Sequence, residues 1–299
     1  MSETPVLKAQ KSHKALVLGG RNGLLGQALV RSLAAHGWEA VCLGREDGDL
    51  MDAEWMAEQL EALAPQAVFN TVAWTQVDDA EDHPGEAMRI NRGFPALLGR
   101  LLCSASIPLV HYSTDFVFNG RKQSPYTTDD TPDPDSVYGE TKLAGEQALL
   151  ASGLERCCII RTAWLFGPGR KNFVSTILNL AKERETIKVV HDQVGSPTYT
   201  MDLAEASLNL VRAGAHGVFH VVNNGQASWC ELAAKAVAIA NLPCTVQAIA
   251  SSDWPQKAKR PPFSPLDTSH YTEVTGKTMR PWLPALRDYI FQDFLGADD

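Results

Sequence analysis

Short apolar runs alternate with longer amphipathic stretches along the first two thirds of the chain. The runs suit strands that are buried on both faces, whereas the stretches between them repeat apolar residues at helical spacing. This order predicts parallel strands at 14–18, 39–43, 67–72, 108–112 and 157–161, with helices at 27–36, 52–63, 86–103 and 135–150. We therefore predict an α/β fold of the Rossmann type, with a doubly wound parallel sheet.

The alternation weakens after residue 168. The pattern then predicts a helix at 173–182, an ordered loop at 192–198, a helix at 202–212, a strand at 217–222, and an irregular, proline-punctuated stretch from Asn223. We predict a dinucleotide-binding domain at 14–168, completed by about 200–222. The remaining segments, 169–199 and 223–299, would form a smaller, irregular α/β substrate-binding lobe. Residues 1–13 lack periodicity and are expected to be a flexible tail.

Composition narrows the classes of partner. The 299 residues carry a net charge of −8, which argues against nucleic-acid and anionic-membrane partners. No apolar run approaches the roughly 18 residues of a membrane-spanning helix, and the polar start lacks a signal-peptide core, so we expect a cytoplasmic protein. The six cysteines show no Cys-x-x-Cys spacing and are expected to be buried, reduced thiols. No cluster of ligands predicts a metal site.

A glycine-rich turn follows the first predicted strand. Its glycines have the spacing G-x-x-G-x-x-G, and a helix begins just after them. Small residues let such a turn tighten and let a pyrophosphate approach the backbone, while the free amides of the helix start face the phosphates. The turn therefore predicts a dinucleotide site, to which we assign Gly20, Asn22, Gly23, Leu24, Leu25 and Gly26.

In a Rossmann dinucleotide-binding unit, the residues at the end of the second strand determine the preference for NADP or NAD. Arg45 would pair with a 2′-phosphate, whereas the neighbouring acidic residues Glu46 and Asp47 would accept a 2′-hydroxyl. The sequence offers both, and a solvated charge cluster is the third interpretation. We favour NADPH and keep NADH as the alternative. The other residues that we assign to the cofactor are Asp49, Leu50, Val72, Ala73, Trp74, Tyr138 and Lys142.

Tyr138 and Lys142 lie four positions apart in a predicted helix and would share one face of it. A cation beside a phenol stabilises tyrosinate and lowers its pKa from about 10, which makes the phenol a proton donor near neutral pH. The spacing is common by chance, so an exposed pair is the alternative. Thr114 follows the fourth strand, at the sheet edge where ligands bind, with a helix cap formed by Ser113 or Asp115 as the alternative interpretation.

The order of these motifs resembles the extended short-chain dehydrogenase/reductase superfamily. More narrowly, the chain resembles the dTDP-4-dehydrorhamnose reductase family. The stretches that carry this likeness are His111-Tyr-Ser-Thr-Asp-Phe-Val-Phe118, Val137-Tyr-Gly-Glu-Thr-Lys-Leu-Ala-Gly-Glu146, Arg161-Thr-Ala-Trp-Leu-Phe-Gly167, Asn172-Phe173, 192–198 and 260–267.

The resemblance implies an NAD(P)H-dependent reduction of the C4 ketone of dTDP-4-dehydro-6-deoxy-L-mannose to dTDP-L-rhamnose. It implies that Tyr138 protonates the carbonyl oxygen, that Lys142 lowers the Tyr138 pKa and holds the nicotinamide ribose, and that Thr114 binds the same oxygen. The substrate would be a dTDP-linked 4-keto-6-deoxy sugar. The residues expected to contact it are Val77, Thr114, Asp115, Phe116, Trp164, Asn172, Phe173 and Arg260.

Two departures from the family pattern keep the sugar open. Trp74 replaces a usual His or Tyr, and Phe116 replaces a usual Tyr. One alternative is a reductase for a different dTDP-4-keto-6-deoxy sugar. Another is a non-catalytic regulatory subunit, because this branch also resembles the β subunit of methionine adenosyltransferase. The resemblance further implies a homodimer and raises a link to Mg²⁺.

Overall fold

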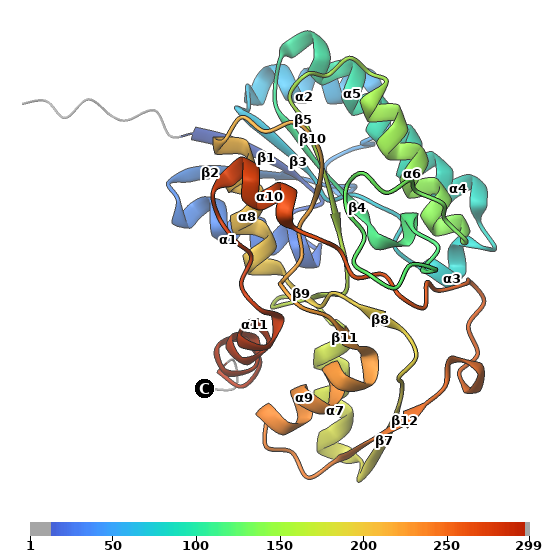
Figure 1. Ribbon diagram of the computed structural model, residues 1–299. Helices are drawn as coiled ribbons and strands as arrows, with labels where there is room; N and C mark the ends of the chain where they lie inside the picture. The colour runs from blue at the N-terminus through green and yellow to red at the C-terminus, as the bar shows by residue number, and fades with distance from the viewer. Residues whose placement is uncertain (1–12, 297–299) are drawn as a thin grey trace, which may run out of the picture.

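A six-stranded parallel sheet forms the centre of the computed structural model, which describes residues 13–296 (Figure 1). Its strands pair in the order β10-β5-β4-β3-β1-β2. They are β1 (His13–Leu18), β2 (Trp38–Leu43), β3 (Ala67–Asn70), β4 (Leu109–Thr114), β5 (Cys157–Thr162) and β10 (Gly217–His220). The chain runs from β1 outward to β2, then from β3 in the other direction, which confirms the predicted doubly wound fold. The predicted tail lies outside the described residues, except for His13.

Helices cover both faces of this sheet. Helices α1 (Leu24–Ala35) and α8 (Thr200–Arg212) pack on one face, and α2 (Ala53–Leu63), α5 (Phe94–Ala105) and α6 (Val137–Leu150) pack on the other. Within β1, Val17 joins the core of the first face and Leu16 that of the second. Successive side chains of a strand point to opposite faces, so a strand buried on both must be apolar throughout.

One predicted helix is divided into three segments. The stretch 86–103 is covered by α4 (Pro84–Met88), the π-helical segment η1 (Arg89–Gly93) and α5, and a short helix α3 (Val77–Ala80) precedes them. Pro95, in the first turn of α5, has no N–H to donate, in line with the change in hydrogen bonding just before it. Asn91, in η1, is buried. Its side-chain amide accepts a hydrogen bond from the backbone N–H of Trp74, after β3, and donates one to the Trp74 carbonyl oxygen.

The lobe, seen below the sheet in Figure 1, contains more regular structure than we predicted. Strands β7 (Thr186–Val190) and β12 (Thr245–Ile249) pair in parallel, and helices α7 (Phe173–Glu183) and α9 (Trp229–Ile239) pack on them. The expectation of an irregular chain after Asn223 was therefore wrong in detail. Its elements are β11 (Ala227–Ser228), α9, β12, the 3-10 turn η3 (Ser251–Asp253), α10 (Ser269–Thr275), α11 (Trp282–Asp288) and the π-helical η4 (Tyr289–Phe294).

A sequence signal for α9 was available, because Ser228 and Glu231 form a capping box at its start. The remaining short elements join the two halves. They are η2 (Asp115–Val117) after β4, and the strands β6 (Leu165–Phe166), β8 (Val194–Gly195) and β9 (Thr198–Tyr199).

The two-domain division remains a prediction. Tyr271 of α10 and Met279 belong to the assigned lobe but pack in the core on the α1 and α8 face of the sheet. Cysteines also differ partly from expectation, since Cys157 and Cys158 are buried and Cys103 is exposed. Within residues 13–296, no helix has the length and apolar character needed to cross a membrane.

Candidate active site

Glycines form the turn between β1 and α1 where packing is closest. A Cβ atom on Gly20 would lie 2.7 Å from the Cys42 sulfur, and one on Gly26 would lie 2.6 Å from the Gly20 Cα. Gly23 is the N-cap of α1, and no side chain caps the amides of the first turn. Helix α1 thus begins three residues earlier than the predicted Gln27, and its first amides remain available for an anionic group.

Arg21 makes the ion pairs at the end of β2. Its guanidinium donates to Asp47 at 2.7 Å and approaches Glu46 at 3.4 Å. Sequence reasoning missed this residue, although its place inside the glycine turn was a signal. Arg45 is exposed and makes no ion pair among the described residues.

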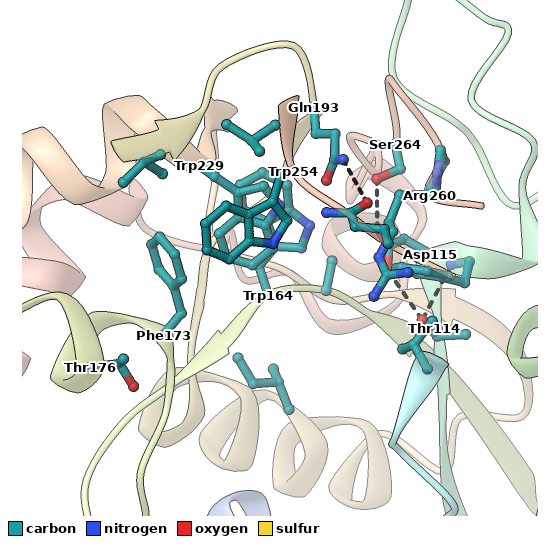
Figure 2. Close-up of a pocket in the computed structure, with 18 of the residues that line it drawn as sticks. Thr114, Asp115, Trp164, Phe173, Thr176, Gln193, Trp229, Trp254, Arg260 and Ser264 are labelled. Atoms are coloured by element: carbon teal, nitrogen blue, oxygen red, sulfur yellow. Dashed lines mark hydrogen bonds between the residues drawn. The ribbon is translucent and has the colours of Figure 1, made fainter. Parts of the chain in front are cut away.

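A cavity of about 690 Å³ opens between the sheet and the lobe, near the carboxyl ends of β4 and β5. Thr114, Asp115, Arg260 and Ser264 gather at one end of it, the polar end, and Phe173, Trp164 and Trp229 lie toward the other, the aromatic end (Figure 2). The predicted residues that line it are Val77, Thr114, Asp115, Phe116, Tyr138, Trp164, Phe173 and Arg260. A cavity of this size, apolar with a few convergent polar groups, is typical of small-molecule sites.

Tyr138 and Thr114 meet at the polar end of the cavity. Ser136 caps α6 by accepting from the N–H of Gly139, which fixes the helix start that carries Tyr138. Burial raises the pKa of Tyr138 to about 12, while a hydrogen bond with Thr114 lowers it and the charge of Asp115 raises it. The phenol is therefore protonated at neutral pH, as a proton donor must be.

Lys142 lies buried, 2 % exposed, one helical turn after Tyr138. Its ammonium donates to the carbonyl oxygen of Tyr112 at 2.5 Å. Burial lowers the pKa of Lys142 to about 8, against the opposing charge of Glu146. We predicted that Lys142 would lower the Tyr138 pKa, but burial raises that pKa in this structure, because the phenol loses contact with water.

A buried ion pair between Glu146 and Arg161 holds the helix that carries Tyr138 and Lys142. The single N–H of Arg161 Nε is shared between the two Glu146 oxygens, at 3.0 and 3.2 Å, and Nη2 donates to the same carboxylate at 2.7 Å. The Ser113 hydroxyl donates to the same carboxylate at 2.5 Å. Since Ser113 and Arg161 are paired residues of β4 and β5, the network ties α6 to both strands directly beneath Thr114.

The aromatic end is ordered by a stack of two indoles. Trp164 and Trp229 lie 3.5 Å apart between ring centroids with an angle of 7° between planes, and Phe173 lies 4.5 Å from Trp229. Trp164 has a φ of +49°, a conformation that is uncommon for a bulky residue and is held here by packing. Gly195 faces the Trp164 ring so closely that a Cβ atom would lie 2.5 Å from it.

Comparison with known proteins identifies the family. Residues 14–294 match the family described as the RmlD substrate binding domain. The chain belongs to the RmlD family. The family resemblance inferred from the sequence is therefore confirmed.

Curated relatives of this RmlD-family chain match over most of its length. The spore coat polysaccharide biosynthesis protein SpsK of Bacillus subtilis is 37% identical, covering 93% of this chain and 96% of its own. A dTDP-4-keto-6-deoxy-D-glucose reductase of Streptomyces niveus is 36% identical, with coverages of 94% and 97%. A dTDP-4-dehydrorhamnose reductase of Streptomyces griseus is 35% identical, with coverages of 90% and 90%.

A solved structure extends the family comparison to three dimensions. The dTDP-4-dehydrorhamnose reductase of Bacillus anthracis, in complex with NADP, superposes with a TM-score of 0.90 at 30% identity. The match covers 94% of this chain and 99% of that one.

Two residues assigned to the sugar or the cofactor have other contacts in this RmlD-family protein. Asn172 does not line the cavity, because its side chain caps α7 by accepting from Ser175 N–H and donates to the carbonyl oxygen of Gly167 at 2.9 Å. Trp74 also stays outside the cavity lining, and its backbone N–H donates to Asn91 at 2.8 Å. Asn91 therefore has a structural role here, because its amide bonds the Trp74 backbone and the Thr141 hydroxyl.

The other assigned cofactor residues lie around the glycine turn or near it. Val72 follows β3 and would lie 3.3 Å from a Cβ atom on Gly19. Leu50 is buried in the core on the α2 face, whereas Asp49 is exposed and accepts from the N–H of Met51. Ala73 is half-buried beside Val72.

Several cavity residues were missed by sequence reasoning, namely Thr176, Lys188, Gln193, Trp229, Trp254, Gln256 and Ser264. They come from the lobe, whose strands β7 and β12 we had not predicted. Trp229 offered a signal, since it begins the capped helix α9. Among residues 13–296, no group of three or more His, Cys, Asp or Glu side chains forms a metal-binding cluster, and we assign no Mg²⁺ ligands.

Proposed function

We propose that this protein reduces the C4 ketone of dTDP-4-dehydro-6-deoxy-L-mannose with NADPH and so forms dTDP-L-rhamnose. The proposal rests on one observation above all: Thr114 and Tyr138 line one cavity with Trp164, at the same edge of the sheet as the glycine turn. The named activities of the Streptomyces relatives support the substrate class, and the NADP complex of the Bacillus anthracis protein supports the cofactor.

The glycine turn fits a dinucleotide, because its close packing excludes side chains and leaves the α1 amides to the phosphates. We propose Arg45 for the 2′-phosphate of NADPH, since its guanidinium is exposed beside this turn. NADH remains the alternative, with Asp47 as acceptor of a 2′-hydroxyl, although Asp47 is engaged by Arg21. We propose that Lys142, one helical turn after Tyr138, holds the nicotinamide ribose.

A nicotinamide, when bound, would supply the hydride for C4 of the sugar. As the carbonyl oxygen gains negative charge, the Tyr138 hydroxyl gives it a proton, so one hydride and one proton convert the ketone to an alcohol. The Thr114 hydroxyl, which donates to Asp115 at 3.1 Å here, turns to donate to the same oxygen. Phe116 packs edge-on to the Tyr138 ring, at 5.5 Å between centroids, and limits its rotation.

The lobe supplies the binding surface for the rest of the substrate. We assign the sugar to the polar end beside Val77 and Phe116, with Trp164 of the aromatic end facing it, and the nucleotide to the aromatic end with Phe173 and Trp229. Flat aromatic faces suit both the apolar face of a sugar and a pyrimidine. Asn172 is then a support for Phe173 and not a direct contact.

The second candidate is reduction of a different dTDP-4-keto-6-deoxy sugar. The Streptomyces niveus relative, named for the D-glucose series, matches this chain about as well as the rhamnose-forming relative. The chemistry at Thr114 and Tyr138 would be the same, so only the shape of the cavity separates the two candidates.

The test is NADPH oxidation, followed by absorbance, with dTDP-4-dehydrorhamnose and with dTDP-4-keto-6-deoxy-D-glucose as separate substrates. The proposal expects faster turnover of the first and a product with L-rhamno stereochemistry. Preference for the second supports the other candidate. Absence of oxidation with either sugar would favour the regulatory-subunit alternative. Sedimentation of the pure protein tests the homodimer that the family leads us to expect.

A further inference from the structure

One segment of the lobe crosses the cavity and is fixed on both sides of it. We call residues 254–264 the strap. Ahead of it, the N–H and hydroxyl of Ser251 donate to Asp192, at 2.9 and 2.6 Å. At its far end, the Ser264 hydroxyl donates to Asp115 at 2.5 Å, as the dashed line in Figure 2 shows. The strap residues that line the cavity are Trp254, Gln256, Arg260, Pro261 and Ser264.

Asp78 holds the middle of the strap from helix α3. It accepts the backbone N–H groups of Lys257 at 2.9 Å and of Ala258 at 2.8 Å. It also accepts two hydrogen bonds from the Arg260 guanidinium, at 2.5 and 2.8 Å. The bond with Arg260 holds the pKa of Asp78 at about 2, so the carboxylate is ionised throughout the neutral range.

These contacts leave part of the Arg260 guanidinium unused. A guanidinium has five N–H groups. The two N–H groups on Nη1 donate to Asp78 and to the carbonyl oxygen of Ala258, the latter at 2.7 Å. One N–H on Nη2 donates to Asp78 as well. The Nε group and the second Nη2 group have no partner among the described residues. Arg260 lines the cavity, and its side chain is 18 % exposed.

We propose that Asp78 is a positioning residue for ligand binding, which fixes the strap and directs the free N–H groups of Arg260 toward an anionic group of the ligand. The proposal rests on the proposed function, which supplies such a group in the diphosphate of a dTDP-sugar. A guanidinium held in one orientation binds phosphate oxygens at a smaller entropic cost than a free one. Asp78 is not among the cavity-lining residues, so it acts through Arg260 and the strap backbone.

The matched control is Asp82, which also lies beside α3 and pairs with the strap through Lys257. Its carboxylate contacts neither Arg260 nor a strap amide. We expect Asp78→Asn to raise KM for the dTDP-sugar about tenfold or more, with kcat within about threefold of wild type. Asp82→Asn should leave both constants unchanged. Arg260→Lys, which keeps the charge but not the two-point contact, should raise KM in the same way.

Two measurements that do not depend on catalysis distinguish a role of Asp78 in positioning the strap from an effect on the stability of the whole protein. Trypsin cleavage after Lys259 in the ligand-free protein should be about tenfold faster in Asp78→Asn than in wild type or Asp82→Asn, at unchanged melting temperature. The Kd for dTDP and for inorganic pyrophosphate, measured by calorimetry, should rise about tenfold in Asp78→Asn and in Arg260→Lys.

The outcomes also separate this proposal from the proposed function. Equal cleavage rates together with equal affinities in Asp78→Asn and wild type would overturn the role of Asp78. A wild type that reduces no dTDP-4-keto sugar would overturn the proposed function alone, because cleavage rates and pyrophosphate affinity would still decide what Asp78 does.

Discussion

Tyr138 is the residue from which the proposed reaction takes its proton. Replacing it by phenylalanine removes the hydroxyl but keeps the ring that packs against Phe116. We expect Tyr138→Phe to lower kcat by about 10²–10⁴-fold, the usual contribution of a positioned acid. NADPH affinity, measured by fluorescence titration, should stay within about twofold. Near-normal turnover of this variant would remove Tyr138 from the chemistry.

Lys142 gives the site its pH dependence. With a pKa of about 8 it is an ammonium at pH 7 and loses its charge as the pH rises. Since kcat/KM reports the free enzyme, we expect it to fall above pH 8, about tenfold for each pH unit. Lys142→Arg should move this fall beyond pH 10, because arginine keeps its proton. A decline at the same pH in Lys142→Arg would assign it to another group.

The same shift has a consequence for stability. The folded pKa of Lys142, about 8, lies below the ordinary value of 10.5. Between these values the unfolded chain binds more protons than the folded one, so the contribution of Lys142 to the free energy of unfolding rises with pH across this window. Urea unfolding of wild type and Lys142→Met at pH 7 and pH 10 checks the sign. The gain on going to pH 10 should be smaller in the variant.

At the scale of elements, the Glu146–Arg161 pair holds α6 against β4 and β5. Both side chains are almost fully buried, 1 % and 5 % exposed. Arg161→Met leaves Glu146 buried without its counter-ion, which costs about 3–5 kcal/mol of folding free energy. The pair of Lys122 and Asp130, which is 32 % and 28 % exposed, is the control, since Lys122→Met should cost less than about 1 kcal/mol where water reaches both partners. Similar urea midpoints for the two variants would contradict this account.

Strand β8 sets the position of the indole stack. A methyl group on Gly195 would meet the Trp164 ring at 2.5 Å, so Gly195→Ala must displace that ring from Trp229. We expect a KM for the dTDP-sugar raised about tenfold and an altered tryptophan fluorescence spectrum. Gly85→Ala is the control, because nothing lies within 4 Å of its new methyl group. An unchanged KM in Gly195→Ala would exclude the stack from substrate binding.

The strands show which elements could be predicted from the sequence and which could not. Strands buried on both faces, such as β1 and β5, were predictable because a short, continuous apolar run can be buried only inside the sheet. Strand β7 was not predicted, because its alternation of exposed Thr186 and Lys188 with buried residues extends over only five positions. Its pairing with β12 joins residues about 60 positions apart, and local patterns do not encode such contacts.

The candidate site divides in the same way. Tyr138 and Lys142 lie four positions apart on one helix, so their spacing predicted a shared face, whereas the family resemblance implied that Thr114 acts beside Tyr138. Trp229 and Trp254 enter the cavity from the lobe, through contacts that no short motif describes. Asn172 shows the opposite error, because a residue beside a motif was assigned to the ligand although its amide caps a helix.

For the whole molecule, a cavity walled by the sheet and the lobe couples ligand binding to stability. A ligand that binds only the folded state stabilises it by about 2.7 kcal/mol at a concentration 100 times its Kd. We therefore expect dTDP to raise the melting temperature of the wild type, and to raise it less in Arg260→Lys at the same concentration. Calorimetric melting curves with and without dTDP provide the test. Equal shifts in both proteins would show that Arg260 does not bind this ligand.

The contact of Asp78 with Arg260 joins residues 182 positions apart in the chain. During synthesis, the amino-terminal part of a protein emerges first and begins to fold before the rest is made. All six strands of the sheet have been made once β10 has emerged, whereas the strap follows it. The nascent chain therefore holds the residues of its glycine turn, Thr114 and Tyr138 well before it can close the wall that would retain a sugar nucleotide.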